Sequence, residues 1–234
     1  MIIRTDIKDE GKIMNIFDIL GPVMVGPSSS HTAGAVRIGY TARTLLGERP
    51  VNAEIGLSGS FAATGSGHGT DRALIAGLLG MKPDDMRIPD SFELADQEGL
   101  AFSFENIRLS GAHPNTAVLR VEGETGRTTK IQASSLGGGR IMIDKLDDTD
   151  VHCTGACPTL IIRNQDSPGM VSEVTGILSE ENVNIATLQL YRDKRGGLAV
   201  MVIETDQPVS QETVSVLEQM QGIERITYIS GEEV

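Results

Sequence analysis

The first part of the chain alternates between helical and strand-like spacing of its apolar residues. Downstream of residue 34, apolar positions recur at intervals of three and four residues, which predicts an amphipathic helix. These positions are Ala35, Ile38, Ala42, Leu45 and Leu46. Residues 51–57 alternate between apolar and polar side chains and predict a strand, whereas residues 73–79 predict an apolar helix. Residues 13–25 precede these elements as a short strand or helix.

Strand-like patterns dominate the next segment. Strands are expected at residues 102–109, 117–122 and 127–136. The turn signal at residues 123–126 joins two of them as a hairpin. Three consecutive glycines, residues 137–139, then interrupt the pattern, and we expect a bulge there before residues 141–143 resume the strand. The order predicts a mixed α/β domain with a late antiparallel section over residues 1–150.

The pattern restarts after an acidic segment at residues 145–150, which we interpret as a domain boundary. A second domain is expected over residues 158–234, with the order strand, helix, strand, strand, helix, strand. The segments are 159–163, 170–179, 183–191, 198–205, 209–221 and 223–229. This βαββαβ order predicts a ferredoxin-like unit. The fold class expected for the whole chain is therefore α/β (α+β) in two domains.

Composition narrows the class of protein. Hydrophobic residues make up 39% of the 234 positions, but aromatic residues contribute only 3% and tryptophan is absent, so the core depends on aliphatic side chains. A formal charge of −12 leaves no basic stripe for phosphates and argues against a nucleic-acid partner. The sequence shows neither a bilayer-spanning apolar run nor a signal-peptide segment. We therefore expect a cytoplasmic protein without a membrane partner.

The chain has two cysteines, Cys153 and Cys157. A disulfide framework is not expected in the cytoplasm. Two thiolates are too few for a structural zinc site, and His152 is the one histidine nearby. We expect the cysteines to serve as small apolar residues in a linker or at a strand edge, and His152 to be structural.

Candidate chemistry is concentrated in two glycine-rich loops that each lead into a predicted helix. The first loop, residues 26–34, carries three serines and His31, and the second, residues 65–71, carries His68. Backbone N–H groups at a helix N-terminus lack intrahelical partners and favour negative charge, so such a loop holds a small anion well. The alternative is a pair of capping loops whose histidines are only structural.

A third histidine, His113, lies in a turn before Pro114, which biases it away from helical backbone angles. Three histidines in turns leave two interpretations of their chemistry open. They could serve as proton shuttles, because an imidazole titrates near neutral pH. They could instead coordinate a single zinc or iron ion.

The second domain resembles an ACT domain. The resemblance rests on residues 164–169 (Asn-Gln-Asp-Ser-Pro-Gly) and on residues 177–185 (Ile-Leu-Ser-Glu-Glu-Asn-Val-Asn-Ile). It implies a dimerising regulatory module, often one that binds an amino acid near the turn between the first strand and helix. The effector-site residues implied here are Asn164, Asp166 and Gly169. A module that only assembles and binds no ligand is the alternative.

The first domain resembles the β chain of iron–sulfur L-serine dehydratase. Residues 26–32 (Gly-Pro-Ser-Ser-Ser-His-Thr), 67–71 (Gly-His-Gly-Thr-Asp) and 113–115 (His-Pro-Asn) match three motifs of that family in order. The first motif continues as Ala33-Gly34, as in two-subunit members, whereas single-chain members have Gly-Pro there. The domain is also similar to the allosteric substrate-binding domain of some phosphoglycerate dehydrogenases, so its fold alone does not establish a chemistry.

The resemblance implies an L-serine ammonia-lyase, which converts L-serine to pyruvate and ammonia. In this family an open iron of a [4Fe–4S] cluster acts as the Lewis acid. Such a cluster would use three cysteine ligands, and this chain has two, so the expected partner is a cluster-bearing α subunit. The catalytic imidazole implied by the resemblance is His68, with His31 and His113 nearby. Residues expected to bind the substrate or hold the loop are Ser28, Ser29, Ser30, Thr32 and Asn115.

A non-catalytic module that senses an amino acid and regulates another enzyme is the alternative function. The anion-binding loop and the ACT-like unit are both compatible with it.

Overall fold

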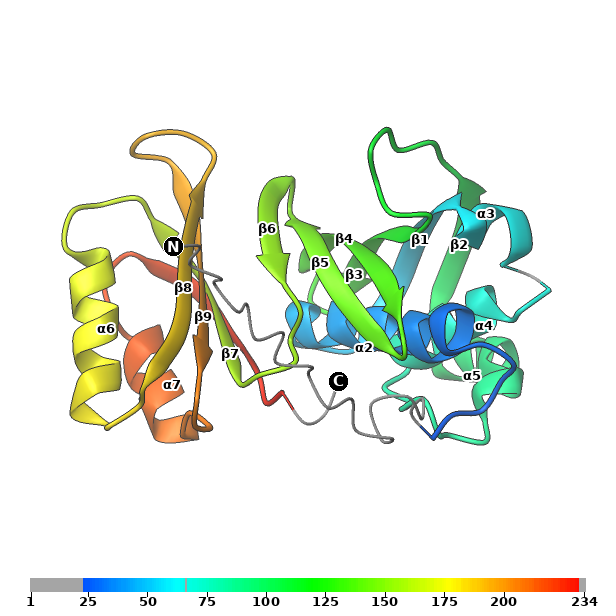
Figure 1. The fold of residues 1–234 in the computed structure, drawn as a ribbon, viewed down its shortest axis with the longest axis horizontal. Helices are drawn as coiled ribbons and strands as arrows, with labels where there is room; N and C mark the ends of the chain where they lie inside the picture. Colours follow the sequence, from blue (N-terminus) through cyan, green and yellow to red (C-terminus); the bar gives the residue numbers. More distant parts are fainter. Residues whose placement is uncertain (1–22, 66, 232–234) are drawn as a thin grey trace, which may run out of the picture.

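A computed structural model describes residues 23–65 and 67–231 of the chain. The element expected at residues 13–25 therefore lies, except for its last three residues, outside the described part. The described chain forms two sheets, each with helices on one side (Figure 1).

The first sheet has six strands in the order β2-β1-β3-β4-β5-β6. Its strands are β1 (Pro50–Gly59), β2 (Ala101–Asn106), β3 (Asn115–Gly123), β4 (Thr128–Gly137), β5 (Arg140–Leu146) and β6 (Thr149–Cys153). Strands β1 and β2 pair in parallel, and the other pairs are antiparallel. The late antiparallel section expected from the sequence is confirmed.

The helices of this domain lie on one side of its sheet (Figure 1). They are α2 (Gly34–Leu46), α3 (Ser60–Thr64), α4 (Thr70–Leu78) and α5 (Ser91–Glu98). All five apolar residues that predicted α2 are buried, so the helix forms because one face joins the core. It ends at Gly47, whose left-handed backbone (φ 76°) is accessible to glycine at little cost.

Helices α2 and α4 approach each other so closely that only glycine fits at two positions. A Cβ atom on Gly39 would lie 2.1 Å from the carbonyl oxygen of Leu74, and one on Gly77 would lie 2.1 Å from that of Val36. The two helices run in the same direction, because their N-terminal loops are neighbours and Arg43, near the end of α2, donates to the carbonyl of Leu78 at the end of α4.

The second domain has the predicted βαββαβ order, with an antiparallel sheet in the order β10-β7-β9-β8. Its elements are β7 (Thr159–Gln165), α6 (Met170–Glu180), β8 (Ile185–Arg192), β9 (Leu198–Thr205), α7 (Gln211–Glu218) and β10 (Ile223–Ile229). Alternation along the strands sends Leu160 and Ile162 toward the helices and Ile161 toward the first domain. The ferredoxin-like prediction is confirmed.

The two domains share a packed interface. Val151 and Cys153 of β6 lie in the same buried cluster as Ile161 and Val202 of the second sheet. Figure 1 shows β6 beside the face of that sheet opposite α6 and α7. Strand β6 extends the first sheet to residue 153, and the second sheet begins at Thr159. Both faces of the second sheet are therefore covered, one by its own helices and one by the first domain.

The structure corrects three local expectations. Residues 145–150, expected as a domain boundary, form the end of β5, the turn and the start of β6, because these two strands pair and the first sheet continues to Cys153. Residues 137–139 form no bulge within one strand but the turn of a hairpin between β4 and β5, because all three glycines adopt positive φ angles (90°, 61° and 76°) and reverse the chain. Helix α5 was missed, because its hydrophobic spacing is weak and only Ser91 and Ala95 are buried in it. In the described residues no helix is long and apolar enough to cross a membrane.

The glycine contact between α2 and α4 predicts an asymmetric response to alanine. Gly77→Ala should lower the free energy of unfolding by about 1–3 kcal/mol, because the new methyl group meets backbone atoms that cannot move independently. Gly176→Ala, on the exposed side of α6 with nothing within 4 Å of the added Cβ, should raise that free energy by about 0.5–1 kcal/mol. Urea unfolding followed by circular dichroism measures both. Equal behaviour of the two variants would contradict the close approach.

Candidate active site

The serine-rich loop forms a short π-helical turn, Ser29–Ala33, that leads directly into α2. Ser28 caps this turn, with its Oγ accepting from the backbone N–H of His31 at 3.1 Å. The extended backbone of Ser28 (φ −143°, ψ 124°) suits a cap position. The predicted position of the loop at a helix N-terminus is confirmed, and it directs the hydroxyls and His31 to one end of α2.

The His31 ring is held by residues that the sequence did not single out. Its Nε2 lies 3.1 Å from Ser60 Oγ and 3.2 Å from Thr64 Oγ1, both on α3. The Thr64 hydroxyl donates to the Ser60 carbonyl, so it can only accept from His31, which favours the tautomer protonated at Nε2. Nδ1 then faces Ser28 Oγ at 3.5 Å as the unprotonated nitrogen. Phe61 packs edge-on against the ring at 5.4 Å between centroids.

The two glycine-rich loops meet at their histidines. The ring centroids of His31 and His68 are 5.0 Å apart and nearly perpendicular, and Thr32 donates a hydrogen bond to the carbonyl of His68 at 3.3 Å. Burial lowers the pKa of His31, the neighbouring His68 lowers it further, and a hydrogen bond with Ser60 acts in the opposite direction. His31 is therefore held neutral at neutral pH beside a solvent-exposed second imidazole.

The third motif reaches the same place through its backbone rather than through His113. The carbonyl of Pro114 accepts from the N–H of Ser60 at 2.6 Å, where Gly59 (φ 59°) leaves room for it. The His113 ring accepts from Asn115 N–H through Nδ1 at 3.1 Å. It lines a different cavity, of about 380 Å³, together with His152. The backbone of this turn therefore contacts the site, whereas the His113 ring lies in a different cavity.

The β4–β5 hairpin encloses the serine loop from the other side. Ser29 Oγ accepts from the N–H of Gly138 at 3.3 Å, and Ser30 Oγ lies 3.4 Å from where a Cβ on Gly137 would stand. A Cβ on Gly34 would lie 2.0 Å from Ser135 Oγ, so only glycine allows α2 to begin this close to β4. These contacts fix the serine loop between the hairpin and α3.

Some of the residues expected at the site lie together in the structure. Those assembled around one centre are Ser28, Ser29, Ser30, His31, Thr32 and His68. Thr32 is buried and its hydroxyl holds the His68 loop. Sequence reasoning missed Ser60 and Thr64. For Ser60, its position after Gly59 at the end of β1, beside the start of β3, is the signal that could have identified it, and Thr64 follows one helical turn later.

The residues of the expected effector site form contacts within the second domain itself. Asp166 accepts from Gly196 N–H at 2.8 Å and from Arg192 at 3.1 Å, and these contacts hold the pKa of its carboxyl below its usual value. Gly169 (φ 96°) begins α6. Asn164 is buried and donates to the carbonyl of Gln165 at 2.8 Å, while its side-chain oxygen has no partner among the described residues.

The two cysteines differ in their surroundings. Cys153 is buried in β6, and this burial raises the pKa of its thiol to about 11, whereas Cys157 is exposed. A protonated, buried thiol is a poor metal ligand. Within the described ranges, no three histidine, cysteine, aspartate or glutamate side chains are grouped to hold a metal ion, and this includes the three motif histidines.

Comparisons with known proteins match the two domains to two families. A family model described as "Serine dehydratase beta chain" matches residues 15–145, and the ACT domain model matches residues 158–222. The chain is similar to a D-3-phosphoglycerate dehydrogenase of Archaeoglobus fulgidus, at 24% identity over 98% of this chain and 44% of that protein.

Two relatives align along nearly their whole length. The "Probable L-serine dehydratase, beta chain" of Bacillus subtilis is 37% identical over 94% of this chain and 99% of its own. The "L-serine dehydratase, beta chain" of Peptoniphilus asaccharolyticus is 36% identical over 93% and 97%. The chain therefore belongs to the serine dehydratase β-chain family and carries an ACT domain after its first domain.

Proposed function

We propose that this chain is the β subunit of an L-serine ammonia-lyase that converts L-serine to pyruvate and ammonia together with a separate α subunit. The reaction removes the α-proton and the β-hydroxyl, and the aminoacrylate formed tautomerises and hydrolyses. The contact between the His31 and His68 rings, at the mouth of a loop of three serines, carries the proposal. It brings proton-transfer groups and carboxylate-binding groups to one place.

The serine loop supplies donors for the substrate's carboxylate. Ser28 and Ser29 each accept a backbone N–H, from His31 and Gly138 respectively. Each hydroxyl therefore keeps its own proton to donate, although a carboxylate would compete for the Ser28 proton with the unprotonated His31 Nδ1, 3.5 Å away. The start of α2 adds the positive end of a helix dipole. These groups would fix the carboxylate and so align the α-proton with a base.

The two imidazoles differ in environment, and this difference suits proton transfer. His68 is exposed, so it can contact a substrate directly, whereas His31 is half-buried and pinned by Ser60. The lowered pKa of His31 keeps it unprotonated at neutral pH, when it can take up a proton. We assign His68 as the imidazole nearer the substrate and His31 as its proton-accepting neighbour.

The departure of hydroxide requires a Lewis acid, and this chain does not fit the cluster that the family implies. A [4Fe–4S] cluster with one open iron needs three thiolates, whereas this chain offers the buried Cys153 and the exposed Cys157. We therefore place the cluster ligands on the α subunit. The proposed active site is complete only when the two chains meet.

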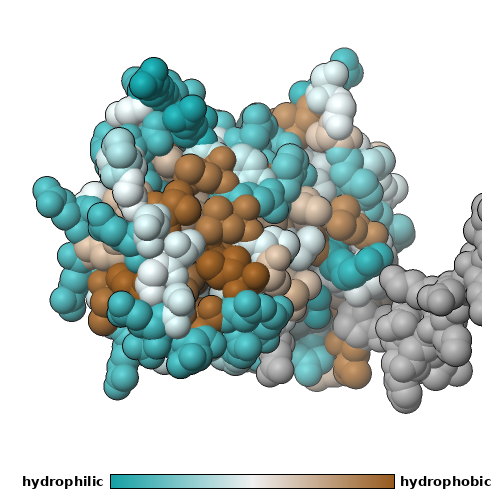
Figure 2. All heavy atoms as spheres, turned by 60° about the vertical axis from the view of Figure 1, so that its left-hand side comes forward, coloured by the Kyte–Doolittle hydropathy of each residue, from teal (hydrophilic) through white to brown (hydrophobic). Residues whose placement is uncertain are grey.

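The ACT domain offers a surface for pairing with a second copy of the chain. Strand β8 is at the edge of its sheet, so one side of its backbone has no strand partner among the residues that the structure describes. Leu190 on this strand is 43% exposed. Figure 2 shows apolar side chains gathered on this side of the molecule. We propose that two copies pair along β8.

Replacing His68 tests the catalytic assignment. His68→Ala should lower kcat for pyruvate formation from L-serine by about 10²-fold or more, because a positioned proton-transfer group is lost. The measurement combines the chain anaerobically with its α partner. His152→Ala is the matched control and should retain wild-type activity, since that ring lies in a separate cavity. Full activity of His68→Ala would refute the assignment. If the wild-type chain bound L-serine but showed no activity with its α partner, the regulatory module would be favoured instead.

The environment of His31 predicts a pattern of pKa changes. By NMR titration, His31 should titrate below the ordinary histidine value, because burial and His68 both disfavour its charged form. His68→Gln removes the neighbouring imidazole that lowers the His31 pKa and should therefore raise it. Ser60→Ala keeps the backbone of residue 60 but removes the hydroxyl 3.1 Å from Nε2, which can accept from the charged ring, and should lower the His31 pKa. Shifts in the same direction for both variants would contradict this account.

The dimer proposal predicts sensitivity at the β8 edge. Leu190→Glu should shift the chain toward monomers in sedimentation velocity, because pairing would bury an unpaired carboxylate. Val216→Glu changes a residue of α7 that is 52% exposed and lies in a different element, so it should leave the distribution unchanged. A monomeric wild-type chain, or equal effects of the two variants, would argue against pairing along β8.

A further inference from the structure

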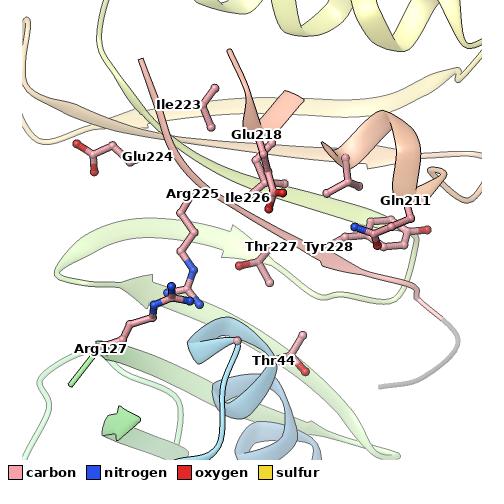
Figure 3. Close-up of a pocket in the computed structure, with 12 residues that line it drawn as sticks. Thr44, Arg127, Gln211, Glu218, Ile223, Glu224, Arg225, Ile226, Thr227 and Tyr228 are labelled. Carbon is pink, nitrogen blue, oxygen red and sulfur yellow. The ribbon is translucent and has the colours of Figure 1, made fainter. Parts of the chain in front are cut away.

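A second polar centre lies at the opposite end of α2 from the histidines, at the junction of the two domains. A cavity of about 570 Å³ opens there, within the range of small-molecule sites. Its walls come from the end of α2, the turn before β4, helix α7 and strand β10. Figure 3 shows Arg127 and Arg225 reaching toward one another from the two domains.

Both guanidinium groups converge on the C-terminus of α2. Arg225 donates to the carbonyl of Leu45, and Arg127 Nη1 donates to that of Leu46 at 3.4 Å. A Cβ on Gly47 would lie 3.1 Å from Arg225 Nη2 and 3.5 Å from Arg127 Nη1. The two like charges therefore share the space over a single glycine.

Capping α2 occupies only a small part of the hydrogen-bonding capacity of the two guanidinium groups. Each guanidinium has five N–H donors, and one of each is engaged by a recorded hydrogen bond within residues 23–65 and 67–231. Among those residues, neither arginine lies within 4 Å of a carboxylate oxygen, whereas the third arginine nearby, Arg163, is paired with Asp147. A second acidic residue nearby, Glu48, is bound to Thr125 instead.

The two guanidinium groups repel each other at this short separation when no anion lies between them. Burial, together with the smaller effects of the charges of Arg163 and Arg127, lowers the pKa of Arg225 to about 10 against weaker opposition from Asp147 and Glu48. A bound anion would offset this repulsion, because a carboxylate accepts parallel N–H bonds from a guanidinium fork.

We propose that Arg127 and Arg225 form a binding site for the carboxylate group of a small organic anion at the domain junction. Hydroxyl groups that line the cavity fit the remainder of such a molecule. Tyr228, for example, accepts from the N–H of Val209 at 3.1 Å and keeps its own proton to donate. Glu218 also lines the cavity, and its negative charge disfavours a dianion such as phosphate. The site binds a single carboxylate in preference.

This site is separate from the histidines and independent of the proposed reaction. Helix α2 has 13 residues, so its two ends are about 20 Å apart. Binding is therefore measured on the full chain alone, without the α partner or any turnover. Failure of the proposed dehydratase activity would leave the result unchanged.

The test titrates the full chain with sodium acetate at constant ionic strength, with sodium chloride as the replacement salt. NMR signals of the Gly47 amide and of the arginine Nε–H groups report on the cavity. Acetate should shift them saturably. Arg127→Gln should weaken this binding roughly tenfold or more, because a charge-assisted hydrogen bond is lost. Arg127 is exposed, so this variant should fold normally.

Arg120→Gln is the matched control, since it removes an exposed arginine of β3 that does not line the cavity. It should bind acetate as the wild-type chain does. Saturable binding weakened by Arg127→Gln and not by Arg120→Gln supports the site. Shifts that do not saturate, or an Arg127→Gln variant with wild-type affinity, overturn the proposal. Tighter binding of inorganic phosphate than of acetate would overturn the preference for a single carboxylate.

Discussion

The close approach of α2 to α4 is the contact on which the rest of the first domain depends. Gly39 and Gly77 let the two backbones touch where any side chain would separate them. Because the helices run in the same direction, this contact also brings their N-terminal loops together. The His31 loop and the His68 loop come from different parts of the sequence, and their meeting is a consequence of helix packing. A helix separation larger by one methyl group would move the two rings apart.

The same helix joins the candidate active site to the second domain. Its N-terminus carries the serine loop, and the carbonyl of Leu45 near its C-terminus accepts from Arg225 of β10. An α-helix transmits displacement along its axis with little bending, because its hydrogen bonds run parallel to that axis. Movement of β10 relative to Leu45 would therefore reach the loop at the other end. This gives a physical path by which the ACT domain and the histidines can influence one another.

Much of this architecture could be predicted from the sequence, because periodicity reports burial directly. The apolar spacing of α2 and the order of the second domain were correct for that reason. Contacts between distant segments were not predictable in the same way. Ser60 and Thr64 contact His31 from α3, a short helix far from the serine loop in the sequence, and no periodic pattern indicates that contact. The hairpin at Gly138 was misjudged because three glycines permit either a bulge or a reversal, and only the pairing of β5 with β4 decides between them.

The exposure of the candidate site agrees with an active site that is formed by two chains. Removing a weakly acidic α-proton is favoured by a site that excludes water, yet His68 is exposed in the isolated chain. The second sheet is already covered on both faces, so the second domain is not free to cover the histidines without leaving its own interface. In the proposed complex, the chain that supplies the Lewis acid would also supply the missing wall. Binding of that chain would then both exclude water and supply the Lewis acid, on the face where the serine loop, His31 and His68 meet.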